Sequence, residues 1–76
     1  MPKFKIAKID TTKIQLPADT SKTFYFVMSA YTGGEVLEVC TSMSQAYTSA
    51  TLRGAKGGVR VGTIVKEGEQ LFARTI

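Results

Sequence analysis

The segment from Thr23 to Cys40 constrains the fold of this chain more than any other, because TFYFVMSAYTGGEVLEVC is its longest apolar run. The one polar interruption contains Gly33 and Gly34. Two consecutive glycines supply the positive φ angles that a tight turn requires, and aromatic or β-branched residues flank the pair on both sides. We therefore expect a β-hairpin across this segment.

A turn at Gly33 and Gly34 fixes which residues of the hairpin face one another. It pairs Tyr31 with Val36, Ala30 with Leu37, Met28 with Val39 and Val27 with Cys40. Because strand side chains alternate, one face becomes the core face, with Phe24, Phe26, Met28, Ala30, Leu37 and Val39. The second face carries Tyr25, Val27, Ser29, Tyr31, Val36, Glu38 and Cys40. This second face is too apolar to be an ordinary solvated sheet surface.

Two shorter segments before this hairpin also favour strands. From Lys3 to Ile9, apolar and basic residues alternate strictly until the parity breaks near Ala7, so a strand is expected that ends or bulges there. Residues 13–16 are a candidate for a further short strand, which Pro17 ends. The first strand is also rich in lysine, which protects an exposed sheet edge.

A helix is expected near residues 43–52. Ser42 is a candidate N-cap, Gln45 completes a capping-box pattern and Gly54 is a suitable stop. The apolar stripe that packs on the sheet consists of Met43, Ala46, Tyr47 and Ala50. Weak helix formers dominate the rest, so the last turn is expected to loosen until Leu52 reaches the core.

The C-terminal part predicts a second hairpin, because β-rich runs at 59–66 and 69–76 flank Glu67 and Gly68. A turn at this pair opposes Lys66 and Glu69. It places Val59, Val61, Val65, Phe72 and Ile76 on one face, and Ile64, Leu71 and Ala73 on the other. A bulged turn that ends at the glycine is the alternative, and it would shift the register by one residue.

Together these elements predict one domain over residues 1–76 of the α+β class. We expect a small antiparallel β-sheet of four or five strands with one short α-helix packed on a face, in the order β-β-β-β-α-β-β. The second strand in this order, at residues 13–16, is only a candidate. Such a helix covers only about 15 Å of sheet, so much of the second face should stay open or meet a partner. In size and element order, with one S-x-S-Q-A helix, the chain resembles several phage-encoded inhibitors, anti-CRISPR proteins among them.

The residue types exclude several kinds of chemistry. A chain without histidine has no Ser-His or Cys-His nucleophile, no histidine base and no usual zinc site. Its six acidic residues fall mostly in expected turns, and no pair is placed in a shared apolar cleft. Cys40 on its strand is expected to be a packing residue. We therefore expect no enzyme, no cofactor and no metal site.

Ten basic residues outnumber six acidic ones, and residues 51–66 contain four bases and no acid. This local excess favours an acidic partner, whereas solubility is the alternative interpretation. The glycine-rich loop at 54–58 lacks the order of a nucleotide-binding P-loop. The residues expected to bind a partner are Arg53, Lys56 and Arg60 for charge, with Tyr25, Tyr31 and Tyr47 as anchors.

The leading hypothesis is a small binding protein, an inhibitor or adaptor, that sterically occupies an acidic or nucleic-acid-binding surface on a protein or ribonucleoprotein partner. One alternative is sequence-nonspecific nucleic-acid binding, in which the same basic residues and the N-terminal lysines neutralise phosphates. Another is a homo-oligomeric structural module, such as a homodimer. No apolar run reaches the ~20 residues of a membrane span and no signal-peptide pattern follows Met1, so a cytoplasmic protein without membrane contact is expected.

Overall fold

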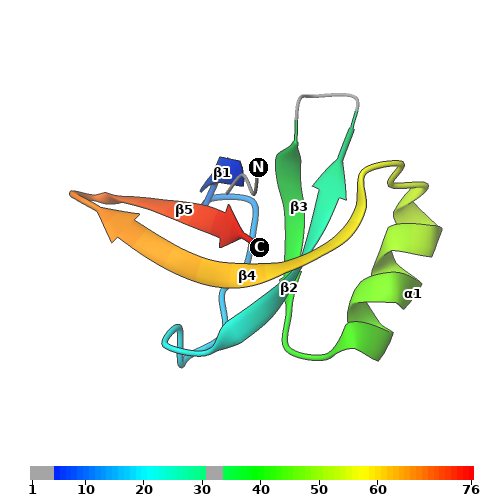
Figure 1. The fold of residues 1–76 in the computed structure, drawn as a ribbon, viewed down its shortest axis with the longest axis horizontal. Helices are drawn as coiled ribbons and strands as arrows, with labels where there is room; N and C mark the ends of the chain where they lie inside the picture. Colours follow the sequence, from blue (N-terminus) through cyan, green and yellow to red (C-terminus); the bar gives the residue numbers. More distant parts are fainter. Residues whose placement is uncertain (1–4, 31–33) are drawn as a thin grey trace.

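The computed structural model describes residues 5–30 and 34–76 of the chain (Figure 1). Five antiparallel strands form one sheet in the order β1-β5-β4-β2-β3, with a single helix beside it. In chain order the elements are β1 (Lys5–Ile9), β2 (Thr23–Ser29), β3 (Glu35–Cys40), α1 (Met43–Arg53), β4 (Gly58–Glu67) and β5 (Gln70–Thr75). The α+β class and the antiparallel sheet are confirmed, whereas the observed order is β-β-β-α-β-β.

The expected strand at residues 13–16 does not form. The Asp10 carbonyl oxygen accepts hydrogen bonds from the amides of Lys13 and Ile14, each at 3.0 Å, and its carboxylate accepts one from the amide of Thr12. This turn takes up amides that a strand would need for pairing. The apolar pattern that suggested a strand instead reflects Ile14, which is 7% exposed and lies in the core.

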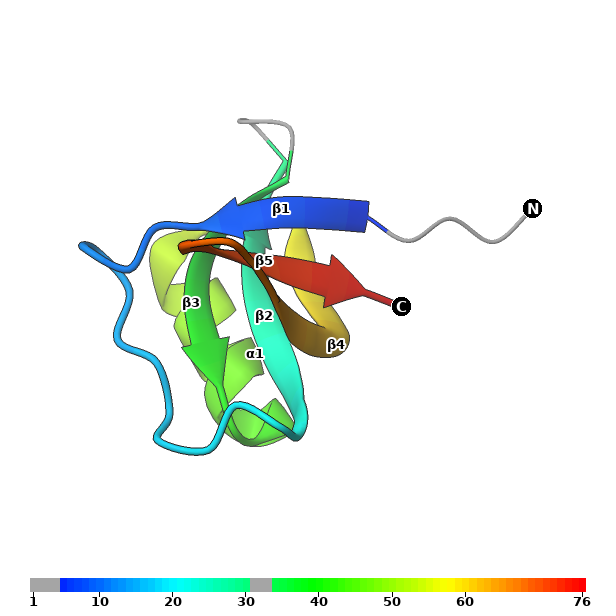
Figure 2. The same ribbon diagram turned by 90° about the vertical axis from the view of Figure 1, so that its left-hand side faces the viewer.

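The sheet curls into a half-barrel because β4 changes its partner along its length (Figures 1 and 2). Its first part pairs with β2 and its second part with β5, and Gly62 lies opposite both Phe24 and Thr75. A Cβ atom on Gly62 would lie 2.1 Å from the carbonyl oxygen of Arg74. Only glycine allows the backbones to approach this closely.

The inside of the curl holds the larger of two apolar clusters, which we call the inner core. Its buried members are Ile9, Ile14, Phe24, Phe26, Met28, Val36, Val39 and Ala73. Ile64 and Leu71 pack against them from β4 and β5. The prediction that Ile64, Leu71 and Ala73 share a face is therefore confirmed.

The register of the C-terminal hairpin differs from the predicted one. Glu67 lies opposite Gln70, so the turn consists of Gly68 and Glu69, and Gly68 adopts a positive φ of 63°. The predicted opposition of Lys66 and Glu69 is wrong, because Lys66 faces Leu71. This change of two residues preserves the faces, since strand side chains repeat every second position.

The prediction that the first strand ends or bulges near Ala7 is wrong. β1 pairs with β5 without interruption from Lys5 opposite Thr75 to Ile9 opposite Leu71. Ile9 is 2% exposed and Ala7 packs against the inner core, so these two residues face inward while Lys8 is exposed. The change in the hydrophobic pattern after Ala7 therefore does not interrupt the strand, and Ala7 and Ile9 supply its inward-facing side chains.

The helix begins and ends where the sequence predicts it. The Gln45 amide donates to the Ser42 hydroxyl at 3.2 Å, and Gly54 adopts the left-handed conformation of a C-cap, with φ 63°. The amide of Gly54 bonds back to the last turn, which keeps that turn helical. The expected loosening therefore does not occur, and Leu52 is 82% exposed.

The helix covers the second face of the β2–β3 hairpin through small side chains. Val27 and Cys40 are buried beneath Ala46 and Ala50, and we call these four residues the outer layer. Met43 and Tyr47, which were expected in the buried stripe, are 52% and 55% exposed. Because alanines let α1 lie close to the sheet, one short helix covers more of this face than predicted.

The predicted register of the β2–β3 hairpin is wrong by two residues, and a bulge adds a further shift. Val27 lies opposite Glu38 and Met28 opposite Val36, so Leu37 is an extra residue on β3. Val36 therefore enters the inner core, while Leu37 packs against the outer layer. The two residues have exchanged the faces assigned from the sequence.

Candidate functional site

One candidate surface lies where α1 meets β2 and β4. Tyr25 on β2 is directly opposite Val61 on β4, and Tyr25 packs against the outer layer beneath the helix. On α1, Ser49 and Arg53 contact β3. Met43 and Tyr47 lie on the other flank, towards β2 and β4, because successive helical residues differ by 100°.

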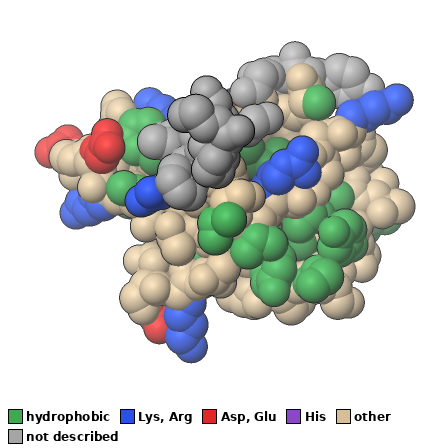
Figure 3. Space-filling model, viewed as in Figure 1, with side chains coloured by type: hydrophobic (Ala, Val, Ile, Leu, Met, Phe, Trp, Pro, Cys, Tyr) green, Lys and Arg blue, Asp and Glu red, His purple; other side chains and the backbone are tan. Residues whose placement is uncertain are grey.

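These four residues, Tyr25, Met43, Tyr47 and Val61, define what we call the α1–β4 face. Val61 is 37% exposed, Met43 and Tyr47 are more than half exposed, and Tyr25 is half-buried. Figure 3 shows hydrophobic side chains gathered on the molecular surface between β4 and α1. A cluster of exposed large apolar side chains that includes aromatic rings is typical of an interaction site.

Two basic residues lie near the start of β4, Lys56 in the segment that follows α1 and Arg60 within the strand. Lys56 and Arg60 are both exposed, and Arg60 Nη1 donates to the Val59 carbonyl oxygen at 3.2 Å. This segment packs tightly on β2, since a Cβ on Gly57 would lie 2.6 Å from the Met28 carbonyl oxygen. Arg60 lies opposite Phe26 of the inner core, so its side chain leaves β4 on the other side of the sheet from Val61, whereas Lys56 lies in the segment before β4.

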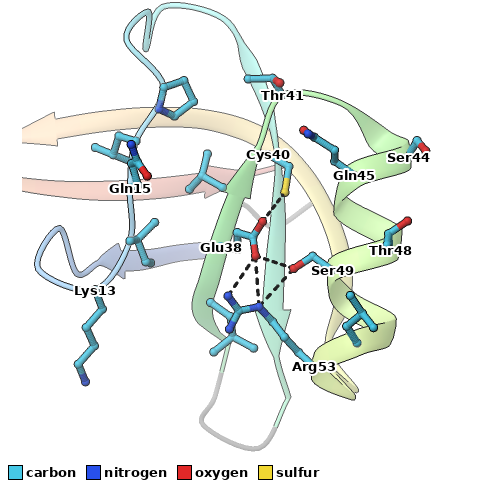
Figure 4. A pocket seen from close by; sticks show the side chains of 16 residues that line it. Lys13, Gln15, Glu38, Cys40, Thr41, Ser44, Gln45, Thr48, Ser49 and Arg53 are labelled. Carbon is cyan, nitrogen blue, oxygen red and sulfur yellow. Dashed lines mark hydrogen bonds and ion pairs between the residues drawn. The ribbon is translucent and has the colours of Figure 1, made fainter.

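The second candidate surface is a groove of about 840 Å³ along β3, which we call the β3 groove (Figure 4). Residues 37–41 form its floor, residues 13–17 form one wall, and α1 forms the other. The helical lining residues are Ser44, Gln45, Thr48, Ser49, Leu52 and Arg53. The groove therefore combines one strand edge with both apolar and polar side chains.

A cluster of polar side chains ties α1 to the floor of this groove. The Ser49 hydroxyl donates to Glu38 Oε1 at 2.5 Å, and Arg53 Nη2 donates to the same oxygen at 3.0 Å. The Cys40 thiol donates to Glu38 Oε2 at 3.2 Å. The carboxylate thus accepts bonds at both oxygens and contributes to the attachment of the helix.

The contacts of this cluster shift the ionisation of Glu38 and Cys40 in opposite directions. The hydrogen bond from Ser49 lowers the pKa of Glu38, as do those from Cys40 and Arg53, against the effect of burial. Burial raises the pKa of Cys40 to about 11, and the Glu38 carboxylate adds to this rise. Cys40 is therefore a buried neutral thiol, which agrees with its expected packing role.

The structure separates the residues that the sequence proposed for partner binding. Tyr25 and Tyr47 belong to the α1–β4 face, Lys56 lies in the segment before β4, and Arg60 points to the opposite side of the sheet from Tyr25. Arg53 instead lines the β3 groove and forms an ion pair with Glu38. Tyr31 lies outside the described residues.

Sequence reasoning missed most of the two surfaces. Met43 was assigned to the buried helical stripe, and only the size of Ala46 and Ala50 could have indicated that the helix buries its smallest residues. The ion pair of Glu38 with Arg53 joins residues 15 positions apart and gives no periodic signal. The groove depends on the path of residues 13–17, which were expected to form a strand.

Comparisons with known proteins add no assignment, because no protein-family model, no curated protein and no solved structure matches this chain. Within the described parts of the chain, no group of three acidic or cysteine side chains is placed to hold a metal ion. The same residues include no helix with the length and apolar character needed to cross a membrane. The two surfaces are therefore interpreted from their own geometry.

Proposed function

We propose that this chain is a small non-enzymatic binding protein, an inhibitor or adaptor, that uses the α1–β4 face to occupy an acidic or nucleic-acid-binding surface of a protein or ribonucleoprotein partner. The observation that carries the proposal is the exposure of Met43, Tyr47 and Val61 around Tyr25. Aromatic and methionine side chains at the centre with charges at the rim are the usual composition of an interface.

The positive charge of residues 51–66 sets the chemistry of the partner. Lys56 and Arg60 are exposed, and no acidic residue lies between positions 51 and 66. A basic rim attracts an acidic partner and raises the rate of encounter more than the final affinity.

An affinity pull-down from the source cell, with nuclease-treated and untreated lysates, tests the proposal. We expect the wild-type chain to retain a specific protein, and Lys56→Glu with Arg60→Glu to lose it. The matched control is Lys22→Glu with Lys66→Glu, which applies the same charge change at exposed positions elsewhere. Equal capture by both double variants would contradict the proposed role of the α1–β4 face.

Direct binding of nucleic acid is the second candidate, because the chain combines two accessible tyrosine rings on the α1–β4 face with exposed lysine and arginine residues, as in stacking platforms for single strands. A gel-shift titration against random DNA and RNA at several salt concentrations separates the two. Direct binding predicts affinity that falls steeply with salt, whereas a protein-directed inhibitor shows no shift. Light scattering at micromolar concentration identifies the remaining alternative, a homo-oligomeric module, by its mass.

A further inference from the structure

β3 is one edge of the sheet, and its outer side forms the floor of the β3 groove. It pairs with β2 on one side, and among residues 5–30 and 34–76 no strand pairs with its other side. In an edge strand, every second residue directs its amide and carbonyl groups away from the sheet. Such a row of backbone groups is a template for an added strand.

The two walls give this edge the form of a channel for one extended chain. α1 lies on one side and residues 13–17 on the other, and the groove between them is open to solvent. Leu52 is 82% exposed and presents an apolar side chain to the groove, while Leu16 and Pro17 on the opposite wall are half-buried. Apolar residues on both walls suit the alternating side chains of a bound strand.

Charge gives the channel a direction. Lys13 and Arg53 lie at the same end, on opposite sides of β3, whereas Thr41, Ser44 and Gln45 lie towards the other end (Figure 4). Among the described residues that line the groove, Glu38 is the one acidic residue, and its charge is neutralised by the ion pair with Arg53. Lys13 is exposed and leaves this end with a net positive charge.

We propose that the β3 groove binds an extended segment of a partner protein, which adds to β3 as an antiparallel strand and places an acidic residue near its C-terminal end beside Lys13 and Arg53. Antiparallel pairing continues the mode of every strand pair in the described sheet. Because β3 runs from the basic end of the groove towards Thr41, an antiparallel strand ends at the basic end. The bulge at Leu37 confines regular pairing to the part of β3 that follows it. This surface is separate from the α1–β4 face and extends the proposed function.

Selection from a library of random decapeptides with free C-termini tests the inference on the intact chain. Enriched sequences should alternate β-branched or aromatic residues with other residues and should carry Asp or Glu near the C-terminus. Lys13→Glu should weaken an enriched peptide up to about fivefold, as expected for a partly exposed ion pair, when binding is measured by fluorescence anisotropy. Lys22→Glu, an equal change outside the groove, should leave the affinity unchanged.

Methylation of the peptide nitrogens examines the backbone pairing itself. Two versions of the enriched peptide are N-methylated at alternate residues, one on odd and one on even positions. Because only one set of amides faces β3 in an added strand, one version should lose at least about tenfold in affinity and the other should bind normally. Hydrogen exchange should also show new protection of amides within residues 38–41.

Three results would overturn the inference. They are the absence of enriched peptides, equal binding of both methylated versions, and equal effects of Lys13→Glu and Lys22→Glu. The Lys56→Glu and Arg60→Glu double variant should bind the peptide as the wild type does. A loss of affinity in this variant would indicate that the peptide binds at the α1–β4 face instead. Circular dichroism of each variant shows that the fold is retained, since the substituted side chains are exposed.

Discussion

The inner core and the outer layer lie on opposite faces of β2 and are built from side chains of very different size. Phe24, Phe26 and Met28 point into the curl of the sheet, where β1, β3, β4 and β5 also contribute. On the other face, Val27 meets two alanines of α1. Since the free energy of burial scales with apolar area, the inner core contributes most of the stability.

This difference shows how a small domain can present binding surfaces without weakening its fold. The helix contributes little to the core, and both candidate surfaces use it: one flank adjoins the α1–β4 face and the other walls the β3 groove. Elements with few buried apolar contacts open at lower free energy than the core. Sequence changes on α1 can therefore alter binding at small cost in stability.

The largest expected effect comes from the centre of the inner core. Phe26→Ala should lower the free energy of unfolding by about 3–5 kcal/mol, because Phe26 is fully buried and its removal leaves a cavity. Chemical denaturation followed by circular dichroism measures this change. Tyr47→Ala, which removes a similar ring from α1, should cost less than about 0.5 kcal/mol. Similar losses for both variants would contradict the division into two layers.

The second-largest loss of stability is expected where the strands approach each other closely at Gly62. Gly62→Ala should cost about 2–3 kcal/mol, because the added methyl group would collide with the backbone of Arg74 and Thr75. Gly68→Ala is the comparison: nothing lies within 4 Å of its Cβ position, so only its positive φ opposes alanine, at about 1 kcal/mol. A larger loss at Gly68 than at Gly62 would show that crowding does not determine the curl.

A smaller effect is expected in the outer layer. Ala46→Gly should cost about 1–2 kcal/mol, from helix propensity and the loss of one buried methyl group. Thr48→Gly, on the exposed side of the same helix, should cost about 0.5 kcal/mol and isolates the propensity. Hydrogen exchange should show α1 amides opening more readily than those of β2. Equal protection of both elements would indicate that the helix is as firmly held as the core.

The smallest effect concerns the Glu38 cluster, and it depends on pH. Glu38→Gln should cost at most about 1 kcal/mol at pH 7, because Arg53 and Glu38 are 45% and 37% exposed. The pKa of Glu38 is lowered in the folded chain, so its contribution is present above the unfolded value of about 4.3 and is lost as pH falls through the folded value.

Denaturation of the wild type and of Glu38→Gln across the acid range measures this dependence as the difference between the two proteins. The two should converge below the folded pKa of Glu38. Glu35→Gln, on the same strand, is the control for removal of a carboxylate from β3. A difference that persisted at low pH would assign the stabilisation to packing instead of charge.

The sequence predicted those features that depend on neighbouring residues. The limits of α1 follow from Ser42 and Gly54, which act within one turn of the helix. The class of the sheet followed from two antiparallel hairpins. The bulge could not be predicted, because Val36 and Leu37 are both apolar and exchange faces without any change in the hydrophobic pattern.

The candidate site was predicted less well because it depends on contacts between distant segments. Tyr25 and Tyr47 were identified as anchors, and their placement near the same face depends on how α1 packs against β2. Arg53 was expected to act with Lys56 and Arg60, but Glu38 on β3 engages it instead. The groove itself required the path of residues 13–17, which local propensity described as a strand.

The pairing of β1 with β5 bears on how the chain folds during synthesis. Ile9 completes the inner core only when β5 lies beside β1, and β5 follows the other described elements in the order of synthesis. Until then, a nascent chain exposes the apolar interior of the curl along its open side. Translation is slower than the folding of most small domains, so this intermediate persists while β5 is synthesised. Truncation before β5 should therefore produce chains that chaperones retain.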